Sequence, residues 1–292
     1  MLSSPPSSSV IERTLSKGDS GDYPTNRCGH ACALEVNVDL GIRGRVALVT
    51  GASSGIGEAV ALALAEEGAT IAVAARRRDR LEAVALEAKK RGASAAHAFE
   101  VDLDDPESIT GMLMRVRETC GDIQILVANS GGPKPGTFLE LKLDDWDAGY
   151  RGTLRSMLAL VYAVVPAMTA SGWGRIVALT SSSVKQPIPN IALSNVFRIA
   201  LVSALKTLSG EVARGGVTVN SIATGRVLTD RLRHLYPDEK SIHKAAEADV
   251  PAGRVAMPSE FAPLVAFLCG EPARYVTGQT IAIDGGLIKA LF

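Results

Sequence analysis

From Arg45 onward, short apolar runs alternate with longer stretches in which apolar residues recur at helical spacing. The apolar runs predict β-strands at residues 46–50, 70–75, 96–102, 125–129, 175–180, 217–223 and 279–284. The intervening segments predict helices near residues 55–67, 79–91, 105–120, 144–171, 191–214 and 258–269. Alternating strands and helices predict a parallel sheet that is covered on both faces. We therefore expect one doubly wound α/β domain, with a parallel seven-stranded sheet, over residues 41–292.

Residues 1–40 differ in composition from the rest of the chain. They begin SSPPSSS and show little hydrophobic periodicity, which predicts a flexible N-terminal extension. The balance of acidic and basic residues there is not that of an arginine-rich, acid-poor organelle presequence. The motif CGHAC brings Cys28, His30 and Cys32 together, but a second ligand cluster at finger-like spacing is missing. We therefore predict no metal site.

The overall charge and hydropathy limit the classes of partner. Lys plus Arg and Asp plus Glu are each 31, so the formal net charge is zero and there is no basic field to attract nucleic acid or an anionic membrane. Neither an uninterrupted apolar run of about 18 residues nor a secretory signal is visible. Cys120 and Cys269 are expected to be free thiols. The sequence predicts a soluble, cytoplasmic protein that binds neither nucleic acid nor membrane and acts on a small molecule.

The segment TGASSGIG stands directly between the first predicted strand and the first predicted helix. Glycines suit a tight turn, a close approach of backbone N–H groups to a pyrophosphate, and close packing of helix on strand. The helix N-terminus adds a partial positive charge. This context predicts a dinucleotide-binding turn, with contacts from Gly51, Ser53, Ser54, Gly55, Ile56 and Gly57.

The end of the second predicted strand indicates which dinucleotide is bound. An acidic side chain there would favour an unmodified ribose, whereas this chain has Ala75 followed by Arg76, Arg77 and Arg78. A guanidinium can pair with a 2′-phosphate. We therefore favour NADP over NAD, with Arg76 as the phosphate-binding residue and Arg78 at the solvated start of a helix.

The GxxxGxG spacing of the turn resembles the opening of the short-chain dehydrogenase/reductase family. The resemblance covers about 250 residues, includes YVTGQTIAIDGG at residues 275–286, and in overall pattern is to 3-oxoacyl carrier-protein reductases. It implies a Rossmann-type fold, hydride transfer between NAD(P) and a carbonyl or alcohol, and a homodimer or homotetramer. The cofactor contacts that it implies, besides those of the turn, are Asp102, Asn129, Ser130, Gly131, Gly225 and Thr229.

The catalytic positions that the resemblance implies depart from the family pattern. The family uses a tyrosine as proton donor, a lysine four residues later, a serine that orients the substrate and an asparagine. Reading without gaps, these positions fall on Ser194, Arg198, Ser181 and Thr153. A serine hydroxyl is less acidic than a phenol and shorter by a ring, so the usual tyrosine mechanism is absent. Arg198 can still bind the nicotinamide ribose.

The sequence leaves the proton donor open. Lys185, four residues after Ser181 on the loop that leaves the fifth strand, is a candidate, because a partly desolvated lysine can act as an acid. An ordered water is the other candidate, and Tyr150 is a weaker one. A hydrolytic pair of Ser181 and Lys185 is set aside because no oxyanion hole can be recognised in the sequence.

Three functions remain in view. The first is an NADP-dependent oxidoreductase that acts on a 3-oxoacyl thioester or another ketone with an atypical proton donor. The second is a nucleotide-binding protein of the same fold that acts as a sensor or a partner subunit. The third keeps the cofactor and catalyses a dehydration or isomerisation. Residues 228–250 are expected to form a mobile helical flap over the substrate, whose identity the sequence does not reveal.

Overall fold

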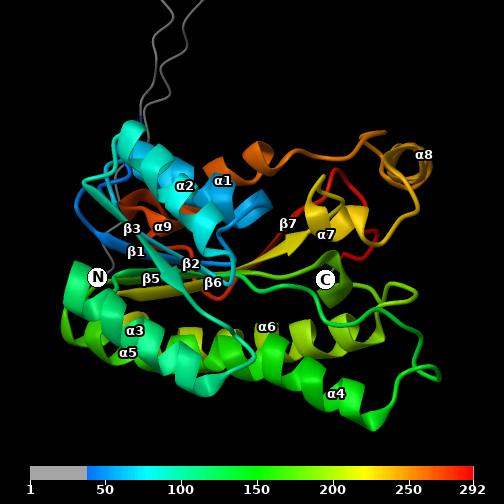
Figure 1. The fold of residues 1–292 in the computed structure, drawn as a ribbon, viewed down its shortest axis with the longest axis horizontal. Helices are drawn as coiled ribbons and strands as arrows, with labels where there is room; N and C mark the ends of the chain where they lie inside the picture. The colour runs from blue at the N-terminus through cyan, green and yellow to red at the C-terminus, as the bar shows by residue number, and fades with distance from the viewer. Residues whose placement is uncertain (1–37, 292) are drawn as a thin grey trace, which may run out of the picture. The chain divides into compact units, whose positions relative to one another are not determined.

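The computed structural model describes residues 38–291, and these form one seven-stranded parallel sheet with helices on both faces (Figure 1). The strand order is β3-β2-β1-β4-β5-β6-β7. The strands are β1 Val46–Thr50, β2 Thr70–Ala75, β3 Ala95–Glu100, β4 Ile125–Ala128, β5 Gly174–Leu179, β6 Val217–Thr224 and β7 Thr280–Ile283. The predicted doubly wound Rossmann-type architecture is confirmed. Because the order reverses between β1 and β4, a crevice opens at the carboxyl ends of these strands.

Helices α1, α2 and α9 cover one face of the sheet, and α3, α5 and α6 cover the other (Figure 1). The helices are α1 Gly55–Glu66, α2 Arg78–Lys90, α3 Pro106–Cys120, α4 Leu143–Gly149, α5 Ser156–Ala170, α6 Ala192–Val212, α7 Asp230–Arg233, α8 Glu239–Asp249 and α9 Ala262–Cys269. Alternation along β1 explains the two cores: Ala47 and Val49 belong to one, and Val46 and Leu48 to the other. Burial on both faces is why the strands are continuously apolar.

The helix predicted at residues 144–171 is regular only in part. It runs from Leu143 to Ala170, with a π-helical segment, Tyr150–Arg155, between α4 and α5. Such segments are frequently found at functional sites, and this one carries Thr153. By length and hydropathy the whole stretch could cross a membrane, but Leu160 and Val164 of α5 pack in the core beneath the sheet, as in a soluble protein's core helix.

The other predicted boundaries differ from the structure by one or a few residues. Strand β3 ends at Glu100, so Asp102 lies beyond it, and Asn129 lies just after β4. The predicted flap consists of two short helices, α7 and α8, and α9 is preceded by a 3-10 turn, Pro258–Glu260. The predictions for residues 1–37, including CGHAC, lie outside the described residues.

Candidate cofactor and substrate cleft

A cleft with a volume of about 1830 Å³ lies at the carboxyl edge of the sheet. Its walls are the segments that follow β1, β2, β3, β4, β5 and β6, together with the π-helical segment and the start of α6. Every residue that we predicted to contact the cofactor lines this cleft, except Gly57, which is buried beneath the turn. Because the strand ends meet at one edge of the sheet, residues that are far apart in the sequence line the same cleft.

The turn after β1 has a backbone conformation that depends on its glycines. Gly51 and Gly55 adopt positive φ angles of 59° and 64°, where side chains are disfavoured. A Cβ atom at Gly57 would meet the carbonyl group of Gly51, with its carbon only 2.9 Å away. Ser54 precedes α1 without a side-chain capping hydrogen bond to the described residues. The first backbone N–H groups of α1 therefore remain available to an anion.

Arg77, rather than Arg76, is the arginine that contacts this turn. Its Nε and Nη2 donate to Ser53 Oγ at 3.2 and 3.0 Å, and Nη2 also donates to Ser54 Oγ at 2.8 Å. Arg76 lines the cleft and is exposed, while Arg78 pairs with Glu82 on α2 outside the cleft. Arg76, predicted to bind the 2′-phosphate, and Arg77 both line the cleft, and Arg77 is the one that contacts the turn after β1.

The turn after β4 is tied to β1 by a reciprocal pair of hydrogen bonds. Thr50 Oγ1 donates to the Asn129 carbonyl at 2.7 Å and accepts from the Asn129 N–H at 2.9 Å. Asn129 Nδ2 donates to the Gly51 carbonyl at 3.3 Å. Ser130 and Gly131 follow and line the cleft. The two turns on either side of the strand-order reversal are thus held in fixed relation.

Asp102, Gly225 and Thr229 complete the predicted cofactor contacts. Asp102 Oδ1 accepts from the Asp104 N–H at 3.0 Å, which fixes the turn after β3. A Cβ atom at Gly225 would come within 2.5 Å of the Asp284 backbone, so this turn has no room for a side chain. The Thr229 hydroxyl caps α7, and its methyl group faces Gly55 of the phosphate turn.

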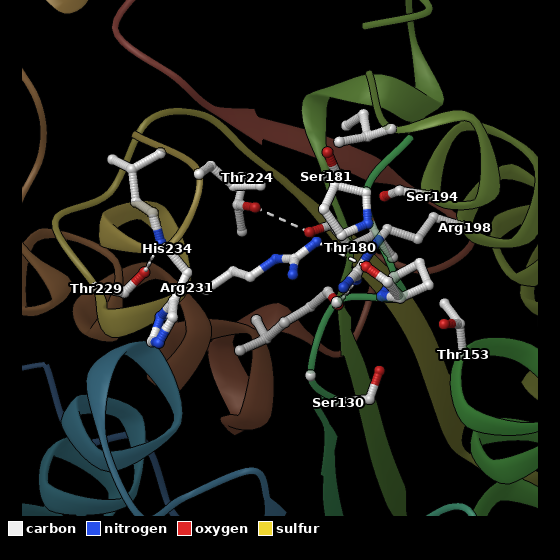
Figure 2. A pocket seen from close by; sticks show the side chains of 18 of the residues that line it. Ser130, Thr153, Thr180, Ser181, Ser194, Arg198, Thr224, Thr229, Arg231 and His234 are labelled. Carbon is white, nitrogen blue, oxygen red and sulfur yellow. Dashed lines mark hydrogen bonds between the residues drawn. The ribbon is translucent and has the colours of Figure 1, made fainter. Parts of the chain in front are cut away.

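The predicted catalytic positions, apart from Lys185, lie together in the cleft (Figure 2). Ser194 and Thr153 are buried side chains at 5% and 2% exposure, and Ser181 is half-buried at the end of β5. Ser181 Oγ accepts a hydrogen bond from the Ser183 N–H at 3.1 Å, which fixes the hydroxyl oxygen. Three hydroxyl groups therefore face one region of the cleft.

Arg198 is 8% exposed on α6, and its Nη1 donates to the Leu179 carbonyl at 3.0 Å. Burial, and next the positive charge of Arg231, lowers the pKa of Arg198 to about 10. A lowered pKa in a cation means that its surroundings disfavour the charged form. The side chain lines the same cleft as Ser181 and Ser194.

Lys185 does not line the cleft, so the geometry does not support its predicted role as proton donor. A 3-10 turn, Ser182–Val184, separates Ser181 from Lys185, and the chain lines the cleft again from Gln186. Tyr150, the weaker candidate, is also not a lining residue; it is 44% exposed, and its ring centroid lies 6.3 Å from that of Phe197. A proton donor must come within hydrogen-bond reach of the reacting atom, and neither residue lines the cleft in which that atom would lie.

The segment after β6 contributes cleft residues that the sequence had not singled out. Arg231, His234 and Tyr236 all line the cleft. Figure 2 shows Arg231 and His234 on the side opposite Arg198. Arg231 Nη2 donates to the Pro133 carbonyl at 2.9 Å, so α7 is linked across the cleft to the segment after β4. The arginine and histidine content of residues 228–250 was the available sequence signal for these cleft residues. The contact between Arg231 and Pro133, 98 positions apart, could not be predicted from it.

Comparison with known proteins agrees with this geometry. The family model described as Enoyl-(Acyl carrier protein) reductase matches residues 51–288. The chain is 34% identical to 3-oxoacyl-[acyl-carrier-protein] reductase FabG of Escherichia coli (strain K12) over 252 residues, covering 85% of this chain and 99% of that protein. The corresponding enzyme of Aquifex aeolicus is 33% identical, with 86% and 100% covered.

Solved structures show the same likeness. The L-sorbose reductase of Gluconobacter frateurii, complexed with NADPH and L-sorbose, superimposes with a TM-score of 0.82 at 33% identity, covering 87% of this chain and 100% of that one. YwfH, an NADPH-dependent reductase involved in bacilysin biosynthesis, gives a TM-score of 0.80 at 29% identity, covering 85% and 99%. The fold, the phosphate turn and these relatives define the chain as a member of the short-chain dehydrogenase/reductase family of oxidoreductases.

Proposed function

We propose that this protein is an NADP-dependent oxidoreductase that transfers a hydride between the nicotinamide and a carbonyl or alcohol substrate. The observation that carries the proposal is that the uncapped phosphate turn with Arg77 beside it and the hydroxyl of Ser181 lie in one continuous cleft. The solved relatives described above include NADPH complexes, which supports the same cofactor here.

The cleft residues fit NADP along its length. The diphosphate would bind the α1 N-terminus and the turn Gly51–Gly57, and Arg77 and Arg76 would bind the 2′-phosphate. Asp102 would contact the adenine, and Asn129, Ser130, Gly131, Gly225 and Thr229 would border the nicotinamide end. The bound cofactor supplies the hydride.

The substrate oxygen would be oriented by Ser181, whose own oxygen is held by the Ser183 N–H and whose hydrogen is therefore left to donate. Ser194, buried on α6, provides a second hydroxyl in the same region. When hydride reaches the carbonyl carbon, the oxygen takes a proton and an alcohol forms. We propose that water from the open cleft supplies that proton, because neither Lys185 nor Tyr150 lines it.

One observation favours a second candidate function. Ser194 and Arg198 replace the tyrosine and lysine of the family pattern, so a protein that binds NADP without turning over a substrate, as a sensor or a partner subunit, fits the same cleft. The remaining alternative, a dehydration or isomerisation that returns the cofactor unchanged, uses the same binding residues.

We also propose that the protein forms a homodimer or homotetramer in the cytoplasm. Exposed apolar side chains support self-association: Tyr162, Val196 and Ile199 on α5 and α6 are 78%, 43% and 48% exposed, and Tyr275 before β7 is 99% exposed. Light scattering of the purified protein measures the oligomeric state directly.

The proposed activity is tested by titrating the protein with NADPH and NADH by fluorescence, and then adding ketones and 3-oxoacyl thioesters while absorbance of the reduced cofactor is followed. The proposal expects tighter NADPH binding and its oxidation by at least one carbonyl compound. Binding without oxidation across the panel would favour the sensor or partner subunit. Substrate conversion without net oxidation would favour dehydration or isomerisation.

A further inference from the structure

Two arginines in the cleft lack a carboxylate partner among residues 38–291. Arg198 is 8% exposed, Arg231 is half-buried, and neither forms an ion pair with any described residue. Each makes one hydrogen bond, to a backbone carbonyl: Arg198 to Leu179 and Arg231 to Pro133. A guanidinium has five N–H donors, so most of its hydrogen-bonding capacity is uncommitted in both residues.

The positive charges of the Arg198 and Arg231 guanidinium groups repel each other. The positive charge of Arg231 contributes to lowering the pKa of Arg198, and burial lowers the pKa of both. Figure 2 shows the Arg231 side chain reaching from α7 toward the side of the cleft that carries Arg198. Buried like charges are costly unless a negative group accompanies them.

The position of Arg231 is fixed by the backbone that it packs against. A Cβ atom at Gly132 would lie 2.5 Å from the Arg231 Cζ atom, so the guanidinium rests directly on this glycine. Its Nη2 is held by the adjacent Pro133 carbonyl. Because Gly132 has no side chain, the Arg231 guanidinium can lie against its backbone. These contacts hold Arg231 in place before any ligand binds.

Three of the six carboxylates that line the same cleft are engaged with other cations, whereas Asp102, Asp104 and Glu140 form no ion pair with any described residue. Asp230, the neighbour of Arg231, lies 3.7 Å from Arg77, 3.5 Å from Arg80 and 3.6 Å from Arg233. Asp249 pairs with Arg226, and Lys134 Nζ lies 2.9 Å from Asp145. None of the six forms an ion pair with Arg198 or Arg231, so these two arginines have no carboxylate partner among the described residues.

This charge lies at the substrate end of the cleft. Arg198 is bonded to the last residue of β5, two positions before Ser181, and Arg231 rests on the segment after β4. The cofactor's 2′-phosphate has a separate site at Arg77, beside the turn after β1. A second anion at the β5 end would therefore belong to the substrate.

We propose that Arg198, for which the family resemblance implied a contact with the nicotinamide ribose, instead forms with Arg231 a binding site for one anionic group, a carboxylate or a phosphate, on the carbonyl substrate. The inference rests on the proposed function and narrows it: the substrate is an oxo acid or a phosphorylated ketone rather than a neutral one. Arginine suits this task because its planar fork matches the two oxygens of either anion.

Matched pairs of compounds test this specificity. Pyruvate, acetoacetate and levulinate are each compared with the methyl ester, and dihydroxyacetone phosphate with dihydroxyacetone, by kcat/KM with NADPH. We expect one anionic member at least to exceed its neutral partner by about tenfold or more in kcat/KM, and Arg231→Gln to abolish that preference. Arg231→Lys should restore part of it. The acid pairs and the phosphate pair separate the two kinds of anion.

Arg233→Gln is the matched control, because Arg233 lies on the same helix, pairs with Asp230 and Glu239, and does not line the cleft. It should leave the preference unchanged. A preference that persists in Arg231→Gln, or the absence of any preference in the wild type, would overturn the proposal. A loss of NADPH affinity in Arg231→Gln comparable to its loss of kcat/KM would also overturn it, since the anion would then be the cofactor's phosphate.

Titration calorimetry tests anion binding at Arg198 and Arg231 independently of the proposed reductase activity. Each acid and dihydroxyacetone phosphate is titrated into the protein with NADPH bound, for the wild type and Arg231→Gln. Arg231-dependent binding of an anion without turnover would sustain the anion site and refute the reductase. Absence of binding by every anion, alongside oxidation of NADPH by neutral ketones, would refute the anion site and sustain the reductase.

Discussion

Arg77 and Ser53 are joined by two hydrogen bonds, from Nε and Nη2 of the guanidinium to the one hydroxyl oxygen, at 3.2 and 3.0 Å. They connect the residue before α2 to the turn before α1, across 24 positions of sequence. The guanidinium is therefore oriented along the rim of the phosphate turn in advance of binding. Preorganisation of this kind lowers the entropic cost of holding a phosphate.

Arg77→Gln should weaken NADPH binding by about 10- to 100-fold and change NADH affinity little, since a charge-assisted contact to phosphate contributes about 1.5–3 kcal/mol. Fluorescence titration measures both dissociation constants. Arg78→Gln is the control, because Arg78 pairs with Glu82 and does not line the cleft. An equal loss for both cofactors would contradict the 2′-phosphate role. If only Arg76→Gln is selective for NADPH, the prediction from sequence was right and the geometric assignment is wrong.

Gly57→Ala should lower the free energy of unfolding by about 1–3 kcal/mol and impair NADPH binding, because its Cβ would collide with the Gly51 carbonyl group. Gly210→Ala is the matched control. Gly210 is exposed within α6 with nothing within 4 Å of an added Cβ, so this change should raise the free energy of unfolding by about 0.5–1 kcal/mol. Denaturant titration measures both values. A Gly57→Ala protein with unaltered stability and cofactor affinity would show that the turn adapts freely.

Lys185→Ala should leave kcat unchanged within about twofold, whereas Ser181→Ala should lower it by about 100-fold, a typical cost of removing a hydrogen bond to a reacting oxygen. The reason is geometric: Ser181 lines the cleft and Lys185 does not. Both variants are assayed by NADPH oxidation with the best substrate. A large fall in kcat for Lys185→Ala with unchanged cofactor affinity would restore Lys185 as the proton donor.

Glu260 gives a prediction for acid stability. Its pKa is lowered to about 2 by the side-chain hydrogen bonds from Arg254 and then by the Met257 N–H. A carboxylate whose folded pKa is depressed stabilises the fold above its ordinary pKa of 4.5, and loses that effect as the pH falls toward about 2. The difference in Tm between the wild type and Glu260→Gln should therefore be largest near neutral pH, be mostly lost by about pH 2 and vanish below it.

The control is Glu118→Gln, an exposed residue of α3 that forms no ion pair with the described residues. It should leave Tm unchanged across the same range. A wild-type advantage over Glu260→Gln that stays constant from pH 7 to pH 2 would show that the carboxylate charge is not what stabilises the turn before α9.

The features that could be predicted from the sequence are those that the local pattern of residues determines. The apolar strands and the strand-turn-helix setting of Gly51 and Gly55 follow from periodicity and motif spacing, whereas Ser181 and Ser194 were implied by the family resemblance. The structure places these four residues in one cleft. Which of three consecutive arginines reaches Ser53 depends on the backbone angles before α2, and a residue pattern does not encode them.

Other features depend on contacts between distant segments. The placement of Arg231 on Gly132 joins the segments after β4 and β6, and neither segment predicts the contact alone. The spacing of Lys185 from Ser181 does not predict the 3-10 turn between them, so the sequence alone could not place the Lys185 side chain relative to the cleft. The π-helical segment that carries Thr153 is invisible to helical periodicity, which it interrupts by only part of a turn.

The most direct test of the proposed hydride transfer is isotopic. The protein is incubated with NADPH deuterated at C4 of the nicotinamide, using both stereoisomers, and with the carbonyl compound that is best turned over or best bound. Mass spectrometry and NMR of the product then locate the label. The account predicts that one stereoisomer delivers deuterium to the carbinol carbon of an alcohol. Conversion of the substrate with all deuterium retained in the cofactor, or tight binding without any transfer, would contradict it.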